Sequence, residues 1–259
     1  MRIPRLFRTD PPMDLSSALT DFWSTNLGQR VLHEERTLIR QVLPRCFGLH
    51  AAQIGSTVDV DWLEDAVIPH RFVVDKGMHV KGLQLCSDPE HLALSAESLD
   101  LLMFHHGLDV GGRPQAWLRE ATRVLRPGGH VMIVGFNPWS TWGVFRWIFF
   151  PWHRQPWLKR PLSPSRLVDW LTLLDFAIIG LEATYAYPPL KHAGSDFYWR
   201  GWAWLLRRFC PQAGAVYVLL ARKQSAVMTP LKLLPRVRAV MQPVWLADSR
   251  PASRDATDS

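Results

Sequence analysis

Two apolar runs separated by an amphipathic segment constrain the fold of this 259-residue chain more than any other feature. The first run, LDLLMFHH, occupies residues 99–106, and the second, HVMIVGFN, occupies residues 130–137. Both have the length of a strand and neither alternates with polar residues, which indicates strands buried on both faces. Between them, QAWLREATRVL places apolar side chains along one side of a helix, and RPGG is expected to end that helix. This order predicts a right-handed crossover between parallel strands.

Further strand-like segments extend the predicted sheet on both sides of this unit. Short apolar runs predict three strands before it, at 49–55, 70–75 and 83–88, and two after it, at 176–187 and 215–223. The predicted fold class is α/β: a doubly wound, mostly parallel seven-stranded sheet of Rossmann-like type with an antiparallel last strand.

Helical periodicity marks two more segments. In residues 22–43, apolar side chains recur at helical spacing and the charged ones are expected on other faces (Glu34, Glu35, Arg36 and Arg40). Ser163 and Pro164 predict an N-cap and a first helical position before a second amphipathic helix. The acidic stretch 59–67 is also helix-like in its pattern.

The domain organisation follows from proline content and periodicity. Residues 1–20 are expected to form a flexible arm, residues 21–224 one domain, and residues 225–259 a basic and then disordered tail. Three scattered cysteines exclude a disulfide framework. The chain shows no secretory signal pattern and no long apolar span, so we expect a cytoplasmic protein, with contact to a membrane only at its periphery.

Basic and aromatic residues gather in the second half of the chain. Residues 139–223 hold 11 Lys and Arg against 4 Asp and Glu, and nine of the 13 tryptophans lie between Trp139 and Trp204. The segments 139–162 and 184–214 are therefore predicted to be lid or substrate insertions. Their composition suits an apolar acceptor or a membrane surface, while stacking on RNA bases is the other interpretation. A tryptophan-rich core covered by arginine stems is the simpler structural alternative.

The segment 98–138, SLDLLMFHHGLDVGGRPQAWLREATRVLRPGGHVMIVGFNP, is similar in residue type and order to the methyltransferase type 11 family. The resemblance implies a class I methyltransferase that uses S-adenosyl-L-methionine. It also implies cofactor-binding residues at the ends of the first four strands. These are Gly55 after the first strand, Asp75 for the ribose hydroxyls, Asp88 for the adenine amino group, Leu92 as an adenine wall, and His105.

His105 and His106 are the candidate catalytic residues, because they end the fourth strand, where such folds place the acceptor. A histidine there can serve as a general base when the acceptor loses a proton, although a structural role is the alternative. Alternation along a strand predicts that only one of the two faces the site. No metal site is expected.

The chain departs from the family at the cofactor loop. Where the family has a G-x-G-x-G run, this chain has HAAQIGSTVD with a single glycine, and only 12 residues separate Asp75 from Asp88. Two functions therefore stay open. The first is methyl transfer to a hydrophobic or aromatic small molecule or lipid; the second is a non-catalytic module that binds a partner through its Trp/Arg surface. An RNA methyltransferase is a weaker third, and the sequence does not address the oligomeric state.

Overall fold

The computed structural model describes residues 15–55, 60–75, 83–110, 113–140, 162–184 and 214–224. The predicted lid segments, apart from their ends, and the predicted tail lie outside these residues. Two compact units divide the chain after Ala226, and all described residues belong to the first.

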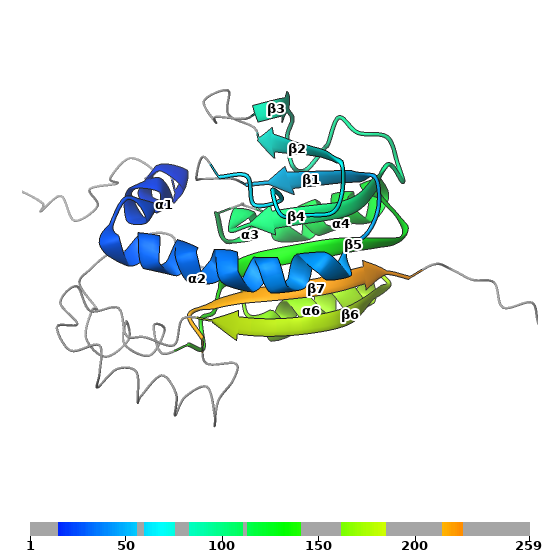
Figure 1. Cartoon of the computed structure of the whole chain (residues 1–259). Coiled ribbons are helices and arrows are strands. Elements are labelled where there is room, and N and C mark those ends of the chain that lie inside the picture. Colours follow the sequence, from blue (N-terminus) through cyan, green and yellow to red (C-terminus); the bar gives the residue numbers. More distant parts are fainter. Residues whose placement is uncertain are drawn as a thin grey trace, which may run out of the picture. The chain divides into compact units, whose positions relative to one another are not determined.

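Seven strands form one sheet in the order β3-β2-β1-β4-β5-β7-β6 (Figure 1). Their bounds are His50–Ile54 (β1), His70–Asp75 (β2), Leu83–Cys86 (β3), Leu99–His105 (β4), Leu125–Phe136 (β5), Phe176–Thr184 (β6) and Val216–Lys223 (β7). The first five strands pair in parallel, whereas β7 runs antiparallel to both β5 and β6. The predicted fold class is confirmed, including the antiparallel last strand.

Helices cover both faces of this sheet (Figure 1). They are α1 (Leu15–Trp23), α2 (Asn26–Val42), a 3-10 turn at Leu43–Arg45, α3 (Gly107–Val110), α4 (Pro114–Val124) and α6 (Pro164–Leu173). Alternate residues of β4 face opposite sides: Leu101 and Met103 pack with α1 and α2, while Leu102 and Phe104 pack with α4 and α6. The buried, non-alternating composition of residues 99–106 is explained by these two apolar layers.

The predicted N-cap and first helical residue of α6 are confirmed. Ser163 Oγ accepts a hydrogen bond from the backbone N–H of Arg166 at 3.4 Å, and Pro164 is the first helical residue. Thr25 caps α2 in the same way, accepting from Gly28 N at 3.1 Å.

Two predicted boundaries and one predicted helix are wrong. Helix α1 begins at Leu15, inside the expected arm, and β5 begins at Leu125, so RPGG lies within the strand. In the acidic stretch, residues 62–65 form turns and none of the described residues is helical. The buried side chain of Gln53 explains this, because it donates to Val60 O and accepts from Trp62 N, which takes these backbone groups out of helical pairing.

Asp100 lies near the amino ends of the central strands, opposite the carboxyl ends where the chemistry is expected. Its Oδ2 accepts hydrogen bonds from the backbone N–H groups of Leu49 at 2.8 Å and His50 at 3.0 Å. Burial favours a higher pKa for this carboxyl group, but these two hydrogen bonds and Arg126 outweigh burial and lower it. Asp100 therefore fixes the start of β1 against β4.

Across the described residues, no helix is long and apolar enough to cross a membrane.

Candidate functional site at the carboxyl edge of the sheet

The strand order reverses between β1 and β4, which makes their carboxyl ends the expected ligand crevice of a doubly wound sheet. Ile54 pairs with Val74 of β2 and with Phe104 of β4, and Asp75 pairs with Cys86 of β3. This register brings the predicted residues Gly55, Asp75, Asp88, His105 and His106 to one edge of the sheet. Their common location follows from the topology alone.

Gly55 allows the end of β1 to approach the start of α3. Its φ of +79° lies in the left-handed region, and a Cβ atom there would stand 2.6 Å from the Cα of Gly107. Any larger residue would clash with backbone and adopt a strained conformation. The single glycine retained in HAAQIGSTVD is thus required by the packing of β1 against α3.

The two predicted acidic residues occupy different settings. Asp75 ends β2 with its side chain partly exposed, and its carbonyl accepts from Ser87 N at 3.0 Å. Asp88 follows β3, where its Oδ1 accepts from Glu90 N at 3.1 Å and closes a turn. Leu92, four residues after Asp88, is buried, and its N–H donates to Glu120 Oε1 at 2.8 Å.

A buried polar cluster lies where α2 crosses the carboxyl end of β4. Glu35 of α2 places Oε2 at 3.1 Å from His105 Nε2 and Oε1 at 3.1 Å from His106 Nε2. The other ring nitrogen of His106 lies 3.1 Å from Asp109 Oδ2, which also accepts from Phe136 N at 3.0 Å. The side chains of Glu35, His105 and His106 have no exposed surface. We call Glu35, His105, His106 and Asp109 the carboxylate–histidine cluster.

The expectation that His105 and His106 point in opposite directions is wrong. Both reach the same carboxylate, because β4 ends at His105 and His106 adopts a φ of +51°. A left-handed residue no longer follows strand alternation, so its ring turns to the side already taken by His105.

Burial and charge act differently on the ionisable groups of the cluster. Burial lowers the pKa of His105 to about 4, which leaves its ring neutral near pH 7. Burial opposes charge on His106 as well, but attraction to Glu35 and the hydrogen bond to Asp109 raise its pKa to about 9. Burial alone would raise the pKa of Glu35, yet the charge of His106 and the hydrogen bonds from both histidines hold it below its usual value.

Aromatic rings enclose the cluster. Trp62, from the turn after β1, stacks on His105 with ring centroids 4.2 Å apart, and Trp23 of α1 lies 5.3 Å from His106. Phe136 of β5 lies 4.2 Å from His106 and 6.0 Å from Trp23. All three rings are buried, so this part of the edge excludes water.

The sequence did not single out Glu35, Trp23 or Trp62 as members of this region. The expectation that Glu35 lies on a different face from the apolar residues of this helix is wrong, since it is fully buried among them. Its position held the signal: Glu35 is four residues after Val31 and three before Leu38, on the apolar stripe of the helix. Trp62 had no comparable signal, because its place depends on a turn that is closed by Gln53.

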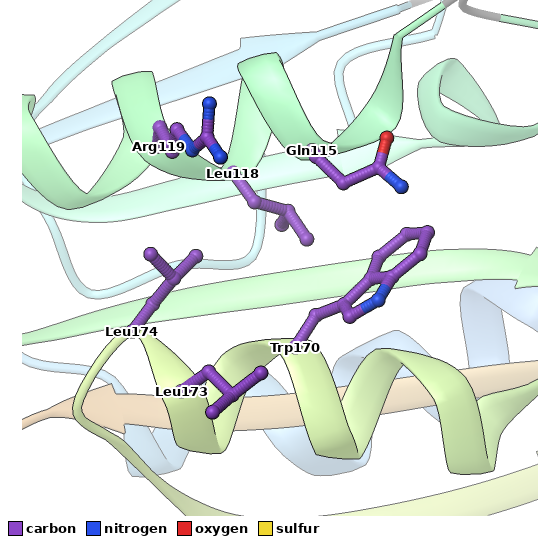
Figure 2. Close-up of a pocket in the computed structure, with 6 residues that line it drawn as sticks. All are labelled: Gln115, Leu118, Arg119, Trp170, Leu173 and Leu174. Atoms are coloured by element: carbon purple, nitrogen blue, oxygen red, sulfur yellow. The ribbon is translucent and has the colours of Figure 1, made fainter.

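A separate hollow of about 120 Å³ lies between α4 and α6 (Figure 2). It is lined by Gln115, Leu118, Arg119, Trp170, Leu173 and Leu174. None of the predicted cofactor or catalytic residues lines it, so it is distinct from the carboxyl edge.

Replacing Glu35 with alanine is expected to destabilise the fold by about 3–5 kcal/mol, because two buried imidazoles lose their partner. Glu34→Ala is the matched control: this neighbouring carboxylate is only partly buried and accepts a hydrogen bond of 3.2 Å from Thr184, so a smaller loss than for Glu35→Ala is expected. Urea unfolding followed by circular dichroism measures both. Equal losses for the two variants would contradict the assigned role of Glu35.

Comparison with known proteins agrees with this architecture. Residues 59–133 match the model of a methyltransferase domain family. YafS, an uncharacterized protein of Escherichia coli (strain K12), is 31% identical over 212 residues, which cover 78% of this chain and 83% of YafS.

Solved structures show the same fold at low sequence identity. A Thermotoga maritima protein, described as an S-adenosylmethionine-dependent methyltransferase and possible histamine N-methyltransferase, aligns with a TM-score of 0.57 at 16% identity, covering 81% of this chain and all of that chain. The plantazolicin methyltransferase BpumL, in complex with a pentazolic desmethylPZN analog and SAH, aligns with a TM-score of 0.52 at 15% identity, covering 83% of this chain and 92% of that one. The chain belongs to one family with YafS and carries a methyltransferase domain match at residues 59–133, in the fold of S-adenosylmethionine-dependent methyltransferases.

Proposed function

We propose that this methyltransferase acts on an apolar or aromatic small molecule or lipid, which it holds near the carboxyl end of β4. The observation that carries the proposal is the enclosure of this edge by Trp23, Trp62 and Phe136. These rings are buried and present no open face, but they make the floor of this edge apolar, which disfavours strongly hydrated acceptors. The Trp/Arg-rich composition of residues 139–223 supports the same class of acceptor. The expected setting is the cytoplasm, with peripheral membrane contact if the acceptor is a lipid.

The residues at the edge fit the nucleoside part of S-adenosylmethionine. Asp75 offers a carboxylate at the end of β2, and a carboxylate can accept two hydrogen bonds from a vicinal diol such as that of ribose. Asp88 offers a second carboxylate after β3, and buried Leu92 offers an apolar surface for adenine. We propose these three residues and Gly55 as the cofactor-binding set, with His105 beside them at the end of β4.

Methyl transfer requires positioning more than acid–base chemistry. The cofactor supplies a methyl group already activated on a sulfonium. The chain must then hold the acceptor in line and exclude water, which the buried aromatic rings favour. The general-base role of His105 or His106 stays a prediction. Both ring nitrogens of His106 lie beside carboxylates, so that ring has no nitrogen open to an acceptor in this arrangement.

Asp75→Ala is expected to weaken cofactor binding about 10- to 100-fold, the loss of hydrogen bonds to a charged group. Titration calorimetry with S-adenosylhomocysteine measures the change. Asp169→Ala, which removes an exposed carboxylate from α6, is the control and is expected to leave the affinity unchanged. An unaltered affinity in Asp75→Ala would remove Asp75 from the cofactor site, and no binding by the wild-type chain would overturn the enzymatic function.

The acceptor class can be tested with methyl-labelled cofactor. After incubation of the full chain with a cell extract, label is expected in the organic-soluble fraction, because the proposed acceptor is apolar. Nuclease digestion, protease digestion and organic extraction of one sample show whether the label is in RNA, in protein or in an apolar small molecule. Label that follows RNA or protein would contradict the proposal, as would transfer only to water-soluble small molecules.

A further inference from the structure

Three donor atoms of the carboxylate–histidine cluster lie close together in the interior. The proposed methyl transfer does not require this grouping. One oxygen of Glu35 and one ring nitrogen from each of His105 and His106 lie within 4.8 Å of one another. The two carboxylate–imidazole separations are 3.1 Å. Donor atoms around a four-coordinate zinc ion stand roughly 3.3 Å apart, for bonds of about 2.0 Å. The two 3.1 Å contacts, one from each oxygen of Glu35, match that spacing, and the three donor atoms would have to draw closer than 4.8 Å to surround a small divalent ion.

Asp109 supports the same ligand set from outside. It contacts Nδ1 of His106, the nitrogen that does not face Glu35. A hydrogen bond from Nδ1–H to a carboxylate leaves the lone pair on Nε2, directed at the proposed ion, and this pairing accompanies most metal-bound histidines. The ring of His105 is fixed independently by stacking on Trp62.

Charge balance gives a second argument for a cation. Glu35 and Asp109 bring two carboxylates into the interior, and in the described part of the chain neither pairs with a lysine or arginine. A buried charge is costly unless it is compensated. A proton on His106 supplies one positive charge against these two carboxylates, whereas one divalent ion bound by neutral imidazoles would balance both.

We propose that Glu35, His105 and His106 bind one divalent transition-metal ion of the zinc class, with Asp109 orienting His106. Two imidazoles and one carboxylate form a ligand set that suits zinc and its neighbours in the first transition series, whereas magnesium prefers oxygen donors. The ion would join α2 to the end of β4, beside the proposed acceptor position. This inference does not depend on which acceptor is methylated.

The test uses the full chain with His70→Ala as background. His50 and His70 place their Nδ1 atoms 3.0 Å apart on the surface, so removing one ring eliminates a competing metal site. After chelator treatment and reloading, elemental analysis is expected to find one tightly bound Zn²⁺ per chain. Bound Co²⁺ is expected to show visible absorption, and Mg²⁺ is expected not to compete.

Glu35→Gln in the same background keeps the size of the side chain and removes the anionic ligand. It is expected to weaken Co²⁺ binding at least about 100-fold, and Asp109→Asn about 10- to 100-fold. Circular dichroism of the metal-free proteins verifies folding. Equal metal affinity in the background and in a folded Glu35→Gln variant would overturn the proposal.

If Glu35→Gln fails to fold, X-ray absorption spectroscopy of zinc bound to the His70→Ala protein identifies the metal ligands instead. Scattering from two imidazoles is the expected result. The absence of imidazole scattering, or of retained zinc, would show that protons alone hold the cluster together.

Discussion

The contact of Glu35 with His105 and His106 is the interaction on which the functional edge of this protein depends. It joins a helix from the start of the chain to the end of the central strand, over a sequence separation of 70 residues. All three side chains are fully buried, so none of them can replace a lost partner with water. The cluster therefore fixes both the position of α2 on the sheet and the rotation of α2 about its own axis.

The same contact orders the groups around it. Asp109 connects His106 to the backbone of Phe136, so β4, α3 and β5 end at fixed positions relative to α2. Gly55 brings β1 against α3 on the other side of the switch point. The carboxyl ends of β1 and β4 are thus held by buried polar and backbone contacts, which provides a rigid base for the proposed cofactor and acceptor sites.

The fold could be predicted from the sequence because its strongest signals are local. Residues 99–106 and 130–137 are apolar without alternation, and the helix between them has one apolar side, so the parallel crossover follows from periodicity. Ser163 with Pro164 marked the start of α6 for a similarly local reason. The place of Asp75 at the edge followed from strand order alone.

The parts that could not be predicted depend on tertiary contacts. The burial of Glu35 could be inferred from its place on the apolar stripe of α2, but its partners lie 70 and 71 residues away and could not be predicted. The left-handed conformation of His106 reverses the direction expected for its ring, and no neighbouring residue type predicts this conformation. The turn at Trp62 replaces a helix because buried Gln53 takes its backbone groups. Long-range polar pairing, rather than local propensity, decided each of these cases.

The carboxyl ends of β1, β2 and β4 are proposed to form the cofactor site. A crystal structure of the full chain with S-adenosylhomocysteine tests it most directly. The expected result is ribose hydroxyls within hydrogen-bonding distance of Asp75 and adenine beside Leu92. A nucleoside bound away from this edge, or a chain that crystallises without it at saturating concentration, would contradict the account.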